Sequence, residues 1–133
     1  MRLSPDLGGD GTAMHVMLLN DTGSTSQSVF QSDLSTLGLT PQYGGLGNIV
    51  SVVTANGQVD QRSIWIQVQL LRTDGTAVSD WIDEMGIIST EPETTRLTGD
   101  LIRNHLYFAT APGNQYLYVA EKAHGILSQL PKV

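Results

Sequence analysis

Cysteine is absent from the 133 residues of this chain, and basic residues are few. Without cysteine there is no disulfide scaffold, no thiolate zinc site and no thiol nucleophile. Lys and Arg number 7 against 13 Asp and Glu, which gives a net charge of −6, and the basic residues form no cluster. Binding to nucleic-acid phosphates requires concentrated positive charge, so we expect no nucleic-acid partner.

Long apolar runs and a leader sequence are missing as well. No apolar stretch approaches the roughly 20 residues of a membrane-spanning helix, so we expect no membrane partner. The chain does not open with a charged-then-apolar leader and a small-residue cleavage site. Together with the lack of cysteine, this predicts an intracellular, cytoplasmic location. His15, His105 and His124 lack metal-site spacing, and we expect neither a metal nor a cofactor.

What is present is the composition of one globular domain, with 40% hydrophobic and 15% charged residues. We expect a polar, glycine-rich N-terminal segment over residues 1–12 and the domain itself over residues 13–133. The pattern within the domain is mostly short strands and turns. The apolar run at 13–20 has the size of a buried strand.

Turn signals predict how the strands pair. The predicted pairs are 48–55 with 58–71 around Asn56-Gly57, 58–71 with 76–82 around the turn at 73–75, and 106–110 with 115–120 around the turn at 111–114. Short helices are predicted at 29–38 and 100–106, and the apolar residues of the tail, Ile126, Leu127 and Leu130, are expected to pack on the body. The sum predicts an all-β domain with two short helices, folded as a closed or nearly closed barrel.

The segment Asp21-Thr22-Gly23-Ser24 carries the chemistry that the sequence offers. It follows the apolar residues MLL with only Asn20 between, so that a carboxylate stands at the end of a strand on a tight turn. Asp, Thr, Gly and Ser are also the residues of ordinary turns, and on their own they favour no more than a turn. The interpretation therefore depends on the segments that surround them.

Three segments in order resemble the retropepsin-like, single-lobe aspartic proteases. They are LLNDTGSTSQSVFQSDLSTLGL at 18–39, VVTANGQV at 52–59 and RLTGDLIRN at 96–104. Members of that family have an apolar strand, an Asp-Thr-Gly loop, a stretch ending in Leu-Gly-Leu, a flap hairpin, and an apolar stretch that closes on Gly before a short helix. The resemblance covers nearly the whole domain and implies the retropepsin-like fold and an aspartic endopeptidase that hydrolyses extended polypeptide.

The resemblance also implies a two-fold homodimer. Peptide hydrolysis without a metal needs a base that activates water and an acid that protonates the leaving amine. Two carboxylates in contact supply both, because like charges so close share one proton. The chain contains a single Asp-Thr-Gly, so the second Asp21 has to come from a second copy across a two-fold axis.

Further roles follow from the resemblance. Thr22 braces the two loops across the two-fold axis, and Gly23 lets the carboxylates approach closely. Ser24 joins the substrate-binding residues, and a hydroxyl that donates to a carboxylate predicts an acidic operating range. Leu97 lines a specificity pocket, with an ordinary core leucine as the alternative.

Thr54, Ala55, Asn56 and Gly57 form the predicted flap tip, which closes over the substrate and offers it backbone groups. A plain surface hairpin is the alternative interpretation, and the glycine-rich residues 44–48 are a second candidate tip. We prefer Asn56-Gly57 because its distance to the turn at 73–75 fits a hairpin followed by the next strand pair.

The chain departs from the family at three positions. Asn20 stands where an apolar residue is usual, and Thr25 and Asp100 replace the acid and the arginine that pair in retroviral enzymes. An alternative function is therefore a catalytically weak or inactive retropepsin-fold module for dimerisation or peptide binding. A structural β-domain of a larger polyprotein is a third interpretation, which leaves the Asp-Thr-Gly loop unexplained.

Overall fold

A computed structural model describes residues 1–54, 57–90 and 95–131 of the chain. Its strands are β1 (Leu18–Leu19), β2 (Gln27–Phe30), β3 (Leu46–Thr54), β4 (Gly57–Val68), β5 (Ile82–Ser89), β6 (Arg96–Leu97), β7 (Tyr107–Thr110) and β8 (Leu117–Ala120). Its helices are the 3₁₀ turn η1 (Pro5–Leu7) and the α-helices α1 (Asp33–Thr36), α2 (Asp100–His105) and α3 (Ala123–Gln129). Strands predominate, as expected. No helix within the described ranges is long and apolar enough to cross a membrane.

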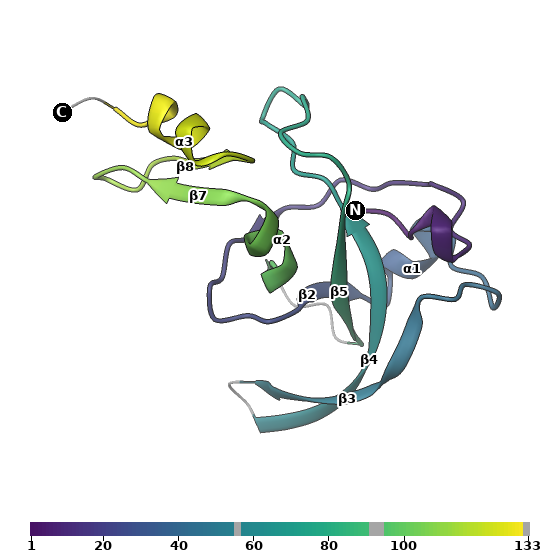
Figure 1. Cartoon of the computed structure of the whole chain (residues 1–133). Helices are drawn as coiled ribbons and strands as arrows, with labels where there is room; N and C mark the ends of the chain where they lie inside the picture. Colours follow the sequence, from purple (N-terminus) through teal and green to yellow (C-terminus); the bar gives the residue numbers. More distant parts are fainter. Residues whose placement is uncertain (55–56, 91–94, 132–133) are drawn as a thin grey trace.

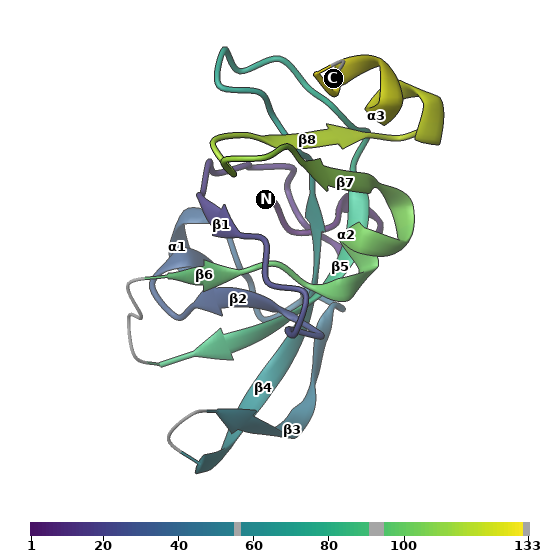
Figure 2. The same cartoon turned by 90° about the vertical axis from the view of Figure 1, so that its left-hand side faces the viewer.

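The described strands form three separate sheets (Figures 1 and 2). The central sheet has four strands in the order β2-β5-β4-β3, while β1-β6 and β7-β8 are two-stranded. The expected closed barrel is therefore wrong for the described part of the chain. Closure requires every strand to pair on both edges. Here β1 is only two residues long and pairs with β6, and residues 69–81 between β4 and β5 contribute a single bridge, Leu71 with Ala77.

The long hairpin predicted around Asn56-Gly57 is confirmed on both sides of its tip. Strands β3 and β4 pair antiparallel up to Thr54 opposite Gly57. Gly57 has a φ of +114°, a conformation that L side chains rarely adopt. The hairpin extends away from the rest of the molecule (Figures 1 and 2). The predicted tip residues Ala55 and Asn56 lie outside the described residues.

Two element predictions are wrong in their bounds. The expected helix at 29–38 is replaced by β2 followed by the single turn α1. Val29 and Phe30 belong to a parallel ladder with β5, and the Asp33 carboxylate accepts a hydrogen bond from the Phe30 amide, 2.8 Å, at the end of that strand. The expected strand at 76–82 is replaced by β5, which begins at Ile82.

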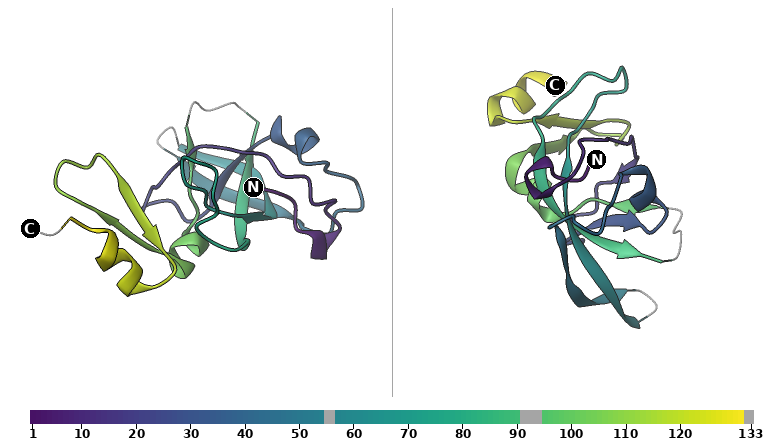
Figure 3. Two further views of the ribbon diagram at one scale, coloured as in Figure 1. Left: turned by 90° about the horizontal axis from the view of Figure 1, so that it is seen from above. Right: turned by 90° about the vertical axis from the view of Figure 1, so that its right-hand side faces the viewer.

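The predicted last hairpin is confirmed, whereas the predicted packing of the tail is confirmed for Ile126 and is wrong for Leu127. Strands β7 and β8 form the last hairpin, and the turn between them has Gly113 and Asn114 at positive φ. The tail adds α3, a third α-helix where two were expected, and buries Ile126 while Leu127 stays 72% exposed. The hairpin and α3 lie together at one end of the molecule (Figures 1 and 3).

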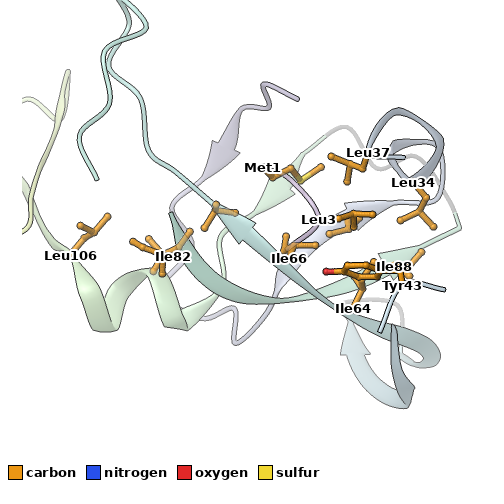
Figure 4. Packing of buried hydrophobic residues seen from close by; sticks show 13 residues of the cluster. Met1, Leu3, Leu34, Leu37, Tyr43, Ile64, Ile66, Ile82, Ile88 and Leu106 are labelled. Carbon is orange, nitrogen blue, oxygen red and sulfur yellow. The ribbon is translucent and has the colours of Figure 1, made fainter. Parts of the chain in front are cut away.

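The hydrophobic core lies between the central sheet and the segments that cross it (Figure 4). Alternate residues of β4, Ile64, Ile66 and Val68, are buried, as the period of two predicts. Met1 and Leu3 of the polar N-terminal segment are also part of this core. The first residues of the chain therefore stabilise the same body that carries the candidate site.

Candidate active site

Asp21 lies on a tight turn directly after β1. Its amide donates to the Leu19 carbonyl, 2.9 Å, and its own carbonyl accepts from the Ser24 amide, 3.3 Å. The Gly23 amide donates to Asp21 Oδ1, 2.8 Å, which folds the carboxylate over its own turn. Asp21 is half-buried, whereas Thr22 and Gly23 are exposed. The turn thus presents a carboxylate at the surface, as the sequence predicts.

Strand β6 fixes the strand that carries this turn. It pairs in parallel with β1, with Leu19 opposite Leu97, and the Thr98 amide donates to the Leu19 carbonyl, 3.0 Å (Figure 2). The Leu97 amide in turn donates to Ser28 Oγ of β2, 3.0 Å. Two segments of the family resemblance, far apart in sequence, therefore lie side by side. Leu97 is half-buried next to Leu19, which is 56% exposed and close to Asp21.

Arg103 of α2 binds the main chain of the Asp21 turn. Its Nη1 donates to the Asp21 carbonyl, 2.7 Å, and to Thr98 Oγ1, 3.2 Å, and its Nη2 donates to the Ser24 carbonyl. A guanidinium suits this task because its donors are held in a rigid plane. Sequence reasoning missed Arg103. The only signal was a basic residue on the short helix after Gly99, with nothing to name its partners.

Glu84 of β5 holds α2 in place. Its carboxylate is fully buried, with Oε2 accepting from the Ile102 amide, 2.9 Å, and Oε1 from the Met85 amide, 3.0 Å. Burial raises the pKa of the Glu84 carboxyl, while these backbone hydrogen bonds oppose the rise. Gly99 packs so closely on this carboxylate that any side chain there would collide with it. Sequence reasoning missed Glu84 as well.

A partly buried ion pair ties β6 to the start of α1. Arg96 Nη2 lies 2.7 Å from Asp33 Oδ1, and the Arg96 guanidinium stacks 4.1 Å from the centre of the Phe30 ring. The other Asp33 oxygen accepts from the Phe30 amide. The pair therefore fixes the strand that lies beside the Asp21 turn, and it gave no recognisable pattern in the sequence.

The two candidate flap tips differ in their surroundings. Thr54 Oγ1 donates to the Gly57 carbonyl, 2.9 Å, across the base of the β3–β4 tip. The glycine-rich segment 44–48 instead forms the start of β3 and the two residues before it, and it is held against the body by backbone hydrogen bonds. The Gly44 amide donates to the Leu7 carbonyl and the Gly45 carbonyl accepts from the Trp65 amide, both 2.8 Å. Segment 44–48 is therefore not a hairpin tip, and the β3–β4 end is.

The Ser24 hydroxyl does not contact the proposed catalytic carboxylate. It donates to the Ser26 carbonyl, 2.7 Å, and so braces the loop rather than the charge on Asp21. The acidic operating range that was expected from Ser24 has no support in this geometry.

Asp21 is the acid of the candidate site. The two buried acids of the described ranges, Asp33 and Glu84, are engaged by Arg96 and by the main chain of α2. The Asp21 carboxylate has the Gly23 amide as its hydrogen-bond donor among the described residues. Within the same ranges, no three His, Asp or Glu side chains gather as metal ligands. Comparisons with protein-family models, with curated proteins and with solved structures found no match for this chain.

Proposed function

We propose that this protein is an aspartic endopeptidase with one active site for two chains, formed by the Asp21 carboxylates of a homodimer. The observation that carries the proposal is the Asp21 turn. Arg103 holds the main chain of that turn through two carbonyls, while the carboxylate itself is left at the surface without a side-chain partner among the described residues. Such a rigid support with a free acid is what a catalytic carboxylate requires.

The chemistry needs two such acids in different protonation states. The ionised Asp21 takes a proton from a water molecule, whose oxygen attacks the carbonyl carbon of the scissile peptide bond. The protonated Asp21 of the second chain donates its proton toward that carbonyl oxygen, and a proton then passes to the leaving amine as the C–N bond breaks. A Cβ at Gly23 would lie 3.3 Å from Asp21 Oδ1, so glycine keeps the space beside the acid open.

The surroundings of Asp21 fit an extended peptide. Leu19 and Leu97 are directly paired across β1 and β6, so their side chains lie on the same face of the ladder and offer apolar surface beside the acid. The β3–β4 hairpin supplies the flap, and Thr54 and Gly57 flank its tip. Thr22 is exposed on the turn, where it is free to brace the second loop. We therefore expect cleavage beside an apolar residue.

A second candidate function is a dimerising, peptide-binding module of low or no activity. It is favoured by Asn20, directly before Asp21, whose side-chain Oδ1 is buried and has no hydrogen-bond partner within the described ranges. The Ser24 hydroxyl, turned to Ser26, also leaves the carboxylate without the donor that the sequence predicted.

Cleavage of a degenerate peptide library between pH 3 and pH 7 separates the two candidates. We expect the wild type to cleave, Asp21→Asn to be inactive, and Asp80→Asn, a change at an exposed acid outside the site, to keep full activity. A statine-type transition-state mimic should block the wild type, because it places a hydroxyl where the attacking water sits. A well-folded dimer without cleavage at any of these pH values would favour the binding module.

A further inference from the structure

Glu84 is a buried acid that no step of the proposed peptide hydrolysis uses. It lies on β5, beside α2, and is 0% exposed (Figures 1 and 2). A buried carboxylate is costly unless it accepts hydrogen bonds or meets an opposite charge. No cation of the described residues forms a salt bridge with Glu84. Its hydrogen bonds to the main chain therefore have to explain why it is there.

The Glu84 carboxylate caps the start of α2 from outside the helix. Gly99 is the N-cap residue of α2 and has no side chain that could accept from the first free amides. Glu84 Oε2 instead accepts from the amide of Ile102, the third residue of the helix, 2.9 Å. A negative charge here also suits the positive end of the helix dipole. Because α2 has only six residues and its own turns stabilise it little, this cap fixes where it begins.

Gly99 leaves the space that the Glu84 carboxylate occupies. Its φ of −83° and ψ of 179° are extended values that any residue adopts, so the backbone does not require glycine here. The three atoms that would lie nearest to a Cβ on Gly99 all belong to the Glu84 carboxyl group, and the Cβ would collide with them. The glycine that ends the apolar stretch before α2 is therefore fitted to a carboxylate from β5.

The same short helix carries the arginine that binds the Asp21 turn. Arg103 follows Ile102 directly, and its guanidinium donates to the Asp21 carbonyl, 2.7 Å, and to the Ser24 carbonyl. It also donates to Thr98 Oγ1, 3.2 Å, in the segment that enters α2. A displacement of the start of α2 therefore displaces the guanidinium, and with it the main chain of the turn.

We propose that Glu84 is a positioning residue for the Asp21 carboxylate and acts through α2 and Arg103. Its two oxygens accept from two amides, those of Ile102 and Met85, and so join α2 to β5. Glutamine has the same size but offers one acceptor oxygen, because its NH₂ group is a donor. The effect of Glu84 on catalysis rests on the proposed peptidase function, whereas its effect on Arg103 does not.

The guanidinium NMR signals of arginine give a readout that needs no activity. The protein is labelled with ¹⁵N-arginine, and the signals of Arg103 and Arg96 are assigned by Arg→Lys variants. We expect resolved Nη signals for both in the wild type, because each guanidinium donates to fixed acceptors. In Glu84→Gln the Arg103 signals should merge as the group rotates faster, while those of Arg96, bound to Asp33, should stay resolved. Unchanged Arg103 signals in Glu84→Gln would overturn the proposal.

Two comparisons separate a change of position from a general loss of structure. Asp83→Asn changes the neighbouring acid of β5, which is exposed, and should leave the signals of both arginines as they are. The Arg96 signals serve as the reference within each variant. If Glu84→Gln affects Arg96 as strongly as Arg103, the whole fold is loosened and the proposal fails.

Gly99→Ala tests the same contact from the other side. The added methyl group collides with the Glu84 carboxyl group, so this variant should also merge the Arg103 signals. In Glu84→Ala the carboxyl group is gone, and adding Gly99→Ala should then change the Arg103 signals no further. An equal effect of Gly99→Ala with and without Glu84 would show that the carboxylate is not what requires glycine, and would overturn the proposal.

Steady-state kinetics tests the step from Arg103 to the reaction. We expect Glu84→Gln to lower kcat up to about tenfold with little change in KM, because a small displacement of a reacting group is costly. In the Arg103→Lys background the same change should lower kcat no further, because the connection to Asp21 is already broken. Equal losses in the two backgrounds would mean that Glu84 acts without Arg103 and would overturn the proposal. If the wild type cleaves no peptide, the peptidase function fails, and the Arg103 signals still decide the role of Glu84.

Discussion

Asn20 stands directly before the proposed catalytic acid and buries a side-chain oxygen that has no donor among the described residues. Replacing it with leucine removes this unsatisfied group. We expect Asn20→Leu to raise the free energy of unfolding by about 1–3 kcal/mol. Urea unfolding at one fixed protein concentration measures the change, with the exposed Asn48→Leu as the matched control. A loss of stability in Asn20→Leu would mean that the buried oxygen does have a donor.

Arg103 is a positioning residue for the Asp21 turn rather than a catalytic one. Lysine keeps the charge but cannot reach the Asp21 and Ser24 carbonyls and Thr98 Oγ1 with one planar group. We expect Arg103→Lys to lower kcat about ten- to a hundredfold, because small misplacements of reacting groups are costly, while KM changes little. Steady-state kinetics on one peptide measures both constants, and Arg62→Lys, exposed on β4, is the control. An unchanged kcat in Arg103→Lys would remove this role.

The residues of the candidate site differ in whether adjacent residues in the sequence predict their contacts. The tight turn that carries Asp21 could be predicted, because four adjacent residues encode it. Arg103 could not, because its partner carbonyl at Asp21 lies 82 residues away in sequence. The role of Ser24 was misjudged for a related reason, because a hydroxyl in a turn has several acceptors within reach and only the fold selects one.

The strands and hairpins differ in the same way, according to whether a local sequence pattern predicts them. The β3–β4 and β7–β8 hairpins could be predicted because each depends on a turn signal of a few residues. Strand β2 could not, since Val29 and Phe30 also fit a helical face and only the parallel ladder with β5 decides between the two. The prediction of a closed barrel was wrong for the same reason. Closure depends on how the edge strands of the sheets pair, and no local sequence pattern describes that pairing.

The contact between β5 and α2 makes the stability of the fold depend on pH through Glu84. Burial raises the pKa of this carboxyl above the ordinary glutamate value of 4.5, so the folded state binds a proton more tightly than the unfolded chain does. The resulting stabilisation is complete below pH 4.5 and is lost as the pH rises through the folded-state pKa. We expect the urea midpoint of the wild type to fall over the same pH range.

Glu84→Gln should lose that part of the pH dependence, because glutamine does not titrate. Its urea midpoint is expected to vary less than that of the wild type from pH 4.5 upward. Glu121→Gln, a change at an exposed acid, should follow the wild type. If Glu84→Gln and the wild type have parallel profiles, the Glu84 carboxyl is not the group that links stability to pH.

Under the proposed function, the single chain is half of an assembly. It carries one Asp21 turn at its surface, and the two buried acids of the described ranges are already engaged. The C-terminal hairpin and α3 carry apolar side chains that water covers in the single chain, among them Tyr116, 69% exposed, and Leu127, 72% exposed. A second copy of the chain would complete the pair of acids and bury additional apolar surface.

Mixing wild-type chains with Asp21→Asn chains tests the shared site most directly. The two are unfolded together in urea, refolded at a constant total concentration and assayed for peptide cleavage. Because an active dimer needs an ionisable Asp21 from each chain, activity should fall with the square of the wild-type fraction. A linear fall would mean that each chain cleaves on its own, and would contradict the two-chain active site.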